Sequence, residues 1–264
     1  MLAHRVADPR VLRLVRQWLA AGILESDEWH ETDTGTPQGA GISPLLANIF
    51  LHYALDLWVH QWRQRYARGR VSIVRYADDF VMGFESGADA RRMLADLKVR
   101  LAKFGLTLHE DKTRLIEFGR LPALARRQRG QRRPGTFAFL GFTHYCGWTR
   151  DGRFIVKHKT QGKRLSRKLQ ALRQEAWRHI HAPLAEQQRW FASVLRGHYG
   201  YYGVPHNYPA LSAFHQEVRR IWFRALRRRS QKARRLTWER FKALLQRFPL
   251  PLPRITHPWA PSQA

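Results

Sequence analysis

The residues that most constrain the fold are 71–84, where two β-rich runs flank a pair of adjacent acids. β-branched and aromatic residues stand on both sides of Ala77-Asp78-Asp79, a pattern typical of an antiparallel hairpin whose turn carries the carboxylates. Because neighbouring strand side chains point to opposite faces, Asp78 and Asp79 cannot serve one ion equally, and Asp78 is favoured. Carboxylates hold Mg²⁺ together with water and phosphates, although an isolated Asp-Asp pair is more often a solvated turn.

The remainder of the first half combines helical and strand patterns. Apolar residues recur every three to four positions in three segments, which predicts helices over 9–21, 43–68 and 88–104. Two further apolar segments, 113–118 and 137–145, are predicted to be strands with a basic loop between them.

From about residue 160 the periodicity is purely helical. The sequence therefore predicts an α+β protein, with an antiparallel sheet and helices over 1–158, an all-helical region over 159–250 and an extended or loose proline-rich tail over 251–264. Four apolar stripes are expected to form the helical core: Leu165, Leu169, Leu172 and Ala176; Trp190, Phe191, Val194 and Leu195; Leu211, Phe214, Val218, Ile221, Trp222 and Leu226; and Trp238, Phe241, Leu244, Leu245 and Phe248.

Positive charge is concentrated in the second half of the chain. The formal net charge is +27, of which residues 121–264 carry +25, and 38 of the 47 basic residues are Arg. A bias toward Arg codons explains Arg over Lys but not the net charge. An acidic membrane surface is one polyanionic partner, but aromatic residues interleaved with the cations favour nucleic acid.

Composition excludes several other classes of protein. One cysteine excludes a disulfide framework, and the lack of a long apolar run excludes a membrane span. With no signal peptide visible at Met1, a cytoplasmic location and no membrane partner are expected. His144, Cys146 and His158 lack the usual spacing of zinc ligands, so a zinc site is disfavoured.

Four sequence blocks, in order, resemble those of group II intron-encoded reverse transcriptases. Tyr76-Ala77-Asp78-Asp79 resembles the Tyr-Ala-Asp-Asp signature of that family. The other blocks are Gly35-Thr36-Pro37-Gln38-Gly39 with Ile42-Ser43-Pro44-Leu45-Leu46-Ala47-Asn48-Ile49, then Gly105-Leu106-Thr107-Leu108-His109-Glu110-Asp111-Lys112-Thr113, and then Phe139-Leu140-Gly141-Phe142. Four blocks in one order are far more specific than any single motif.

The resemblance implies a right-hand polymerase palm over 1–158, partial here, followed by an α-helical thumb or maturase domain. It implies that Asp78 and Asp79 bind catalytic Mg²⁺, or Mn²⁺, during attack of a DNA primer on a deoxynucleoside triphosphate. By the same resemblance Pro37, Gln38, Gly39, Tyr76 and Lys112 lie at the nucleotide, and Leu140, Gly141 and Phe142 hold the primer end.

RNA binding is assigned to Arg164, Arg167, Lys168, Arg227, Arg228 and Arg229, although Arg227–Arg229 also suit a solvated helix end. Tyr199, Tyr201 and Tyr202 are candidates for stacking on unpaired bases, as are Trp222 and Trp238, for which core positions are favoured.

The family carries a further metal-binding Asp on a strand upstream of the first helix. Asp8 is the only acid before that helix, and it reads as a helix cap. The chain is therefore expected to be a fragment, inactive or nearly inactive as a polymerase on its own. The alternatives are a non-catalytic RNA-binding module that helps an intron fold, and a remnant of a retron-type reverse transcriptase.

Overall fold

The computed structural model describes residues 1–20, 23–25, 28–30, 42–131 and 134–258, and the chain divides into two compact units, Met1–Leu115 and Ile116–Ala264. Helices combine with small antiparallel sheets, which confirms the α+β class expected for a partial palm followed by a helical domain. No helix among the described residues is long and apolar enough to cross a membrane.

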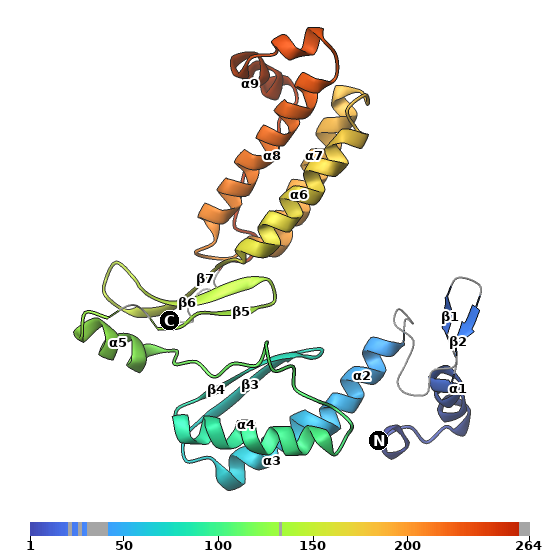
Figure 1. Cartoon of the computed structure of the whole chain (residues 1–264), viewed down its shortest axis with the longest axis vertical. Coiled ribbons are helices and arrows are strands. Elements are labelled where there is room, and N and C mark those ends of the chain that lie inside the picture. The colour runs from blue at the N-terminus through green and yellow to red at the C-terminus, as the bar shows by residue number, and fades with distance from the viewer. Residues whose placement is uncertain (21–22, 26–27, 31–41, 132–133, 259–264) are drawn as a thin grey trace. The chain divides into compact units, whose positions relative to one another are not determined.

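The first unit combines helices with two antiparallel pairs of strands (Figure 1). Its elements are η1 (Leu2–His4), α1 (Pro9–Ala20), β1 (Ile23–Glu25), β2 (Glu28–His30), α2 (Ser43–Leu51), the π-helical η2 (His52–Asp56), α3 (Leu57–Tyr66), β3 (Val71–Tyr76), β4 (Asp79–Phe84) and α4 (Gly87–Ala102). The predicted helices and the acidic hairpin are confirmed, with the second helix running continuously through α2, η2 and α3.

The hairpin lies against α3 and α4 through its apolar inner face. Strand β3 alternates between half-buried and exposed positions, so Val71, Ile73 and Arg75 point inward while Tyr76 points outward. The inner residues pack on a buried cluster of Leu55, Val59, Trp62, Met93, Leu97 and Leu101. Burial of this one face sets the strand register, because a slip of one residue would turn every inner side chain outward.

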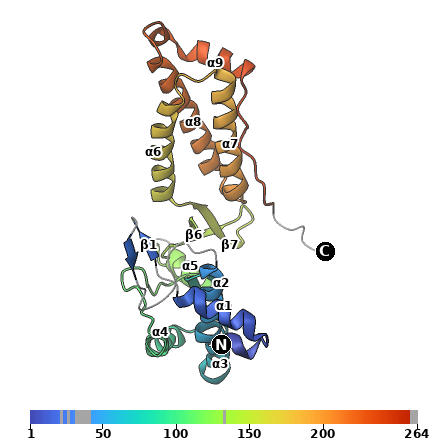
Figure 2. The same ribbon diagram turned by 90° about the vertical axis from the view of Figure 1, so that its right-hand side faces the viewer.

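The second unit places a three-stranded sheet beside a helical bundle. Its elements are α5 (Arg120–Gln128), β5 (Phe137–Phe139), β6 (Phe142–Trp148), β7 (Phe154–Thr160), α6 (Gly162–Arg178), α7 (Leu184–Tyr202), α8 (Tyr208–Arg228), η3 (Lys232–Arg235) and α9 (Trp238–Arg247). Figure 2 shows α6, α7 and α8 side by side, with the sheet next to the end of the bundle where α6 begins.

The predicted apolar stripes form the core of this bundle. Phe191, Leu195, Phe214 and Trp222 are almost completely buried, and Phe241 of α9 closes the cluster over them. The stripe residues that are only half-buried, such as Trp238, pack on the same cluster. The helical periodicity therefore identified the core of this unit correctly.

Three local predictions are wrong. Residues 113–118 form no strand, because no described strand pairs with them and the apolar side chains of Leu115 and Ile116 remain exposed. Part of the expected basic loop is helix α5, which buries Ala123 and places the guanidinium of Arg127 over the ring of Trp148. The strand predicted over 137–145 is two strands, β5 and β6, joined by a tight turn.

The division into compact units falls before the sheet of β5–β7, whereas the sequence suggested a boundary at residue 158. The end of β7 is joined to the bundle by Asn207, whose Oδ1 accepts from the Thr160 amide at 2.8 Å. Its Nδ2 donates to Thr160 Oγ1 and to the Tyr202 carbonyl. This buried bridge ties the sheet to the helices.

The described part of the proline-rich tail forms no helix or strand and is held by hydrogen bonds. The hydroxyl of Tyr199 donates to the Pro251 carbonyl, and Thr256 Oγ1 donates to the Tyr199 carbonyl at 2.7 Å. Gln188 Nε2 donates to the Pro249 carbonyl. The tail is therefore anchored along α7.

Candidate functional site

The acidic hairpin presents its two carboxylates to solvent. Strand β3 pairs with β4 in a register that places Tyr76 opposite Asp79, so Ala77 and Asp78 form a two-residue turn. Asp78 and Asp79 are both exposed, and among the described residues neither is paired with a cation. Unpaired carboxylate oxygens are the donors that Mg²⁺ and Mn²⁺ prefer, so this turn fits such a cation chemically.

Two carboxylates do not by themselves make a complete metal site. In the described part of the chain, no group of three or more His, Cys, Asp and Glu side chains is arranged to hold a metal ion. Water and substrate phosphates would supply the other oxygens at Asp78 and Asp79.

An ion pair lies directly behind the turn. The Arg75 guanidinium donates two hydrogen bonds to the Asp56 carboxylate, at 2.8 and 2.6 Å. These hydrogen bonds lower the pKa of Asp56 and raise the pKa of Arg75. Both groups therefore remain charged throughout the neutral pH range.

Of the other residues assigned to the nucleotide, only Tyr76 lies at the turn among those that the structure describes, as the strand partner of Asp79. Tyr76 is 67% exposed on the outer face of the hairpin. Lys112 lies in an exposed turn after α4, and no described hydrogen bond or ion pair joins it to Asp78 or Asp79. Pro37, Gln38 and Gly39 lie outside the described residues. Their assignment to the nucleotide stays a prediction.

Leu140, Gly141 and Phe142, assigned to the primer, lie in the second unit. They form the turn between β5 and β6, in which Leu140 and Gly141 both have positive φ angles, 48° and 81°. The Tyr201 hydroxyl donates to the Leu140 carbonyl at 2.8 Å, and the Phe142 ring stacks on Tyr201. This turn is held rigidly against the end of α7.

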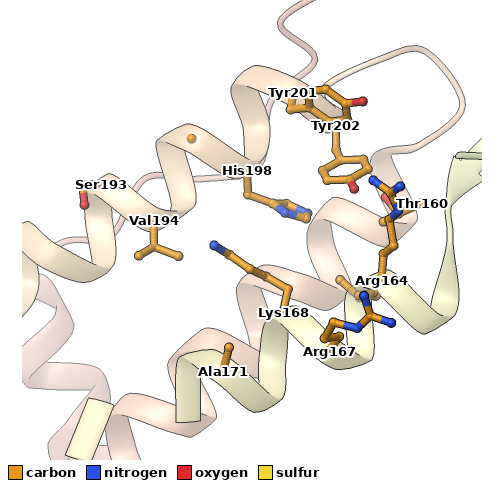
Figure 3. Close-up of a pocket in the computed structure, with 12 residues that line it drawn as sticks. Thr160, Arg164, Arg167, Lys168, Ala171, Ser193, Val194, His198, Tyr201 and Tyr202 are labelled. Atoms are coloured by element: carbon orange, nitrogen blue, oxygen red, sulfur yellow. The ribbon is translucent and has the colours of Figure 1, made fainter. Parts of the chain in front are cut away.

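Three of the predicted RNA-binding cations line one wall of a groove between α6 and α7 (Figure 3). Arg164, Arg167 and Lys168 project from α6 and are exposed. The opposite wall includes His198, Tyr201 and Tyr202 of α7, and the groove has a volume of about 920 Å³. We call this feature the basic groove.

His198 is a buried polar group in the basic groove. It is 7% exposed, and its Nε2 has no hydrogen-bond partner among the described residues. Burial, together with the positive charge of Lys168, lowers the pKa of His198 to about 4. The imidazole is therefore neutral near pH 7, and it stacks on Phe214.

The other predicted cations have structural partners. Arg227 Nε donates to the Arg234 carbonyl, Arg229 Nη2 donates to the His181 carbonyl, and Arg228 lies over the Trp177 ring. These contacts tie the end of α8 to neighbouring segments. RNA binding by Arg227–Arg229 stays a prediction.

Tyr199 is not available for stacking on a base, which corrects that prediction. Its side chain is 1% exposed in the core, and its hydroxyl is bonded to the Pro251 carbonyl. Trp222 is fully buried, as favoured, whereas Tyr201 is about half exposed.

Sequence reasoning missed three features of these sites. Arg75 adjoins the acidic signature, yet nothing local predicted its pairing with Asp56 across 19 residues. His198 and the Asn207 bridge were missed because a single His or Asn carries no pattern. An inward Arg next to a catalytic-type motif was the one signal available.

Comparison with known proteins gives an independent result. The profile of the family described as reverse transcriptase (RNA-dependent DNA polymerase) matches residues 2–144, just over half of the chain. That region contains the acidic hairpin and the β5–β6 turn.

Three relatives match shorter parts. The group II intron-encoded protein LtrA of Lactococcus lactis subsp. cremoris is 44% identical over 64 residues, 24% of this chain and 10% of that protein. An uncharacterized 91 kDa protein in the cob intron of Schizosaccharomyces pombe is 35% identical over 104 residues, 37% of this chain and 12% of the relative. Protein YkfC of Escherichia coli is 31% identical over 105 residues, 30% of this chain and 27% of the relative.

The chain thus spans between about a tenth and about a quarter of the length of these relatives. The resemblance drawn from the four blocks is confirmed by both kinds of match. Since the family profile covers more than half of its residues, the chain belongs to the reverse transcriptase (RNA-dependent DNA polymerase) family.

Proposed function

We propose that this chain serves RNA-directed DNA synthesis by a mobile group II intron, with Asp78 and Asp79 as its metal-binding carboxylates. The observation that carries the proposal is the turn that holds both acids exposed and unpaired, within the segment that matches the reverse transcriptase family. Because these exposed acids have no described cationic partner, a divalent ion can bind them without breaking an existing ion pair.

The chain's own residues would divide the work as follows. Asp78 and Asp79 bind Mg²⁺ or Mn²⁺, while Pro37, Gln38, Gly39, Tyr76 and Lys112 contact the incoming deoxynucleoside triphosphate. Leu140, Gly141 and Phe142 hold the DNA primer. When bound, the metal would activate the primer hydroxyl and offset charge on the transferred phosphate.

The basic groove supports a second part of the proposal, binding of structured intron RNA. Arg164, Arg167 and Lys168 are spaced three and one residues apart, so all three lie on one face of α6. None is matched by an acid on the described groove wall. Such a row of cations neutralises successive phosphates of a polyanion.

Primer extension on an RNA template with Mg²⁺ tests the catalytic part. We expect weak extension by the isolated chain, because among the described residues no third acid joins Asp78 and Asp79. Asp78→Asn should lower that activity by at least about a hundredfold. The matched control is Asp151→Asn, which alters another exposed acid in a hairpin turn. Equal extension by Asp78→Asn and the wild type would contradict the catalytic assignment.

The lack of a described third acid beside Asp78 and Asp79 favours a second candidate function. In this alternative the chain is a non-catalytic RNA-binding module that helps intron RNA fold and splice. Two carboxylates without a third ligand bind a metal weakly, whereas the basic groove is complete within one unit. Splicing assistance that survives Asp78→Ala but is lost on neutralising Arg164, Arg167 and Lys168 would select this candidate over polymerisation.

A further inference from the structure

Arg75 uses its whole guanidinium to connect the acidic turn to the preceding helix. Its Nε and Nη2 donate to Asp56, as described above, while Nη1 donates to Asn48 Oδ1 at 2.9 Å. The same Nη1 also donates to the Ala77 carbonyl at 2.8 Å. The Arg75 side chain is only 14% exposed, and its two hydrogen bonds to Asp56 are partly buried, which limits competition from water for that ion pair.

Strand alternation explains why Arg75 points to the helix. It is the third inward residue of β3 after Val71 and Ile73, and both of these pack on the apolar cluster of the unit. A cation that is largely removed from water at this position requires hydrogen-bonding partners. Asp56 and Asn48 provide them from the helix that lies beneath the hairpin.

The π-helical segment η2 aligns these two partners. Asn48 and Asp56 are eight residues apart, and in a regular α-helix that separation turns the side chains about 80° away from each other. In η2 the Leu57 amide donates to the His52 carbonyl, five residues back. A π turn contains one extra residue, so Asn48 and Asp56 are placed like two residues seven apart in an α-helix. The directions of two such side chains differ by about 20° around the helix axis. Both oxygens therefore face Arg75.

The hydrogen bond from Arg75 to the Ala77 carbonyl acts on a strained part of the backbone. Ala77 has φ of 53°, a left-handed conformation that costs a non-glycine residue on the order of 1 kcal/mol. Its carbonyl belongs to the peptide group that leads into Asp78. The hydrogen bond from Arg75 thus restrains the plane from which the Asp78 side chain projects.

We infer that Arg75 is a positioning residue for the metal-binding turn: anchored by Asp56 and Asn48, it fixes the Ala77–Asp78 peptide and with it the direction of both carboxylates. The inference rests on the proposed function for its metal. Its pairing with Asp56 also keeps the guanidinium occupied, so that it does not neutralise Asp78 in place of a divalent ion. Partners of this kind around metal ligands change metal affinity by about 10- to 100-fold when removed.

Two measurements on the full chain test this inference. The first is Mn²⁺ affinity, followed through the paramagnetic resonance signal of free Mn²⁺, which reports binding without any catalysis. The second is amide hydrogen exchange of a peptide that spans the turn, which reports positioning without any metal. The variants are Arg75→Lys and Asn48→Ala. Arg75→Lys keeps the positive charge but loses the guanidinium, whose separate N–H groups reach Asp56, Asn48 and Ala77, and Asn48→Ala leaves the ion pair between Arg75 and Asp56 intact.

Matched controls lie at the other end of the same hairpin. Arg70 Nε donates to Glu85 Oε1 at 2.7 Å, an exposed ion pair between the open ends of β3 and β4. Arg70→Lys therefore makes the same chemical change on the same two strands without touching the turn. Asp78→Asn defines how much of the Mn²⁺ binding belongs to the site.

We expect Arg75→Lys and Asn48→Ala to speed exchange at the turn and to weaken Asp78-dependent Mn²⁺ binding by about tenfold, with Arg70→Lys unchanged. Unchanged exchange in both variants would overturn the positioning role. Faster exchange with unchanged Mn²⁺ affinity would overturn its link to the metal. A wild-type chain without Asp78-dependent Mn²⁺ binding would instead refute the proposed function, and turn exchange would still decide whether Arg75 holds the turn.

Discussion

The indole of Trp222 donates a hydrogen bond of 2.9 Å from Nε1 to Oε1 of Gln187, inside the core of the helical bundle. Gln187 and Trp222 are 2% and 0% exposed. The amide of Gln187 also donates from Nε2 to the Ile180 and Ala182 carbonyls, at 3.2 and 2.9 Å. One glutamine therefore satisfies three buried polar groups and ties α7 and α8 to the connection after α6.

Replacing Gln187 by Leu should destabilise the second unit strongly. The indole N–H and two carbonyls would lose their partner, and buried groups left unpaired cost about 1–3 kcal/mol each, so a loss of at least about 3 kcal/mol is expected. Urea denaturation measures the change. Gln188→Leu is the control, because Gln188 is only half-buried and, in the described part of the chain, makes one hydrogen bond, to the Pro249 carbonyl. Equal losses in the two variants would contradict the prediction.

His198 should make the stability of the bundle depend on pH. Its pKa falls from an ordinary 6.5 to about 4 in the fold, so the unfolded chain takes up a proton first. With respect to His198, the free energy of unfolding is highest above pH 6.5. It declines as the pH falls and stops changing below pH 4, and the total decrease is at most about 3 kcal/mol. His198→Gln should remove much of this slope, measured by urea denaturation between pH 7 and 4.

Other buried histidines also contribute to the pH dependence of the free energy of unfolding. Burial lowers the pKa of His215 as well, so some pH dependence should remain in the His198 variant. His60→Gln, at an exposed position of α3, serves as the surface control. A His198→Gln chain with the full wild-type slope would refute the prediction.

Alanine at Gly141 should destabilise the turn between β5 and β6 through two separable effects. The φ of 81° strains any other residue, and a Cβ there would lie 2.9 Å from Tyr202 Oη. The Tyr202 ring cannot move freely, since it contacts Phe142 and His198. A loss of about 2–3 kcal/mol is expected from thermal or urea unfolding.

A double-mutant cycle separates strain from steric overlap. Gly152 has a similar φ of 75° but open space where a Cβ would stand, so Gly152→Ala should lose only about 1 kcal/mol. Tyr202→Phe removes the hydroxyl and should recover part of the loss in Gly141→Ala, but none in Gly152→Ala. Recovery in both backgrounds, or in neither, would disprove the close approach of Gly141 and Tyr202.

Neutralising the basic groove should change the salt dependence of RNA binding. Each phosphate contact adds about 0.7 (single strand) to 0.9 (duplex) to the slope of log affinity against log salt, so replacing Arg164, Arg167 and Lys168 by Gln should reduce that slope by about 2 to 3. Filter binding of structured intron RNA across a salt series measures it. The control replaces Arg150, Arg240 and Lys242 by Gln, three exposed cations outside the groove. An equal change of slope in the control would show that only net charge matters.

Features that depend on neighbours along the chain could be predicted from the amino-acid sequence. The hairpin at 71–84 and the helices of the bundle follow from periods of two and about 3.6 residues, and their buried faces match the apolar stripes. The motif at Asp78 and Asp79 was likewise readable, because it is a contiguous run.

Contacts between distant segments became visible in the folded chain alone. Arg75 meets Asn48 and Asp56 because a π segment rotates one helix face, and Tyr199 is buried because the tail crosses α7. Residues 113–118 have a strand-like sequence but no described strand beside them, so they remain irregular. The physical reason is common to these cases: hydrogen bonds and burial between remote residues depend on partners that no local period encodes.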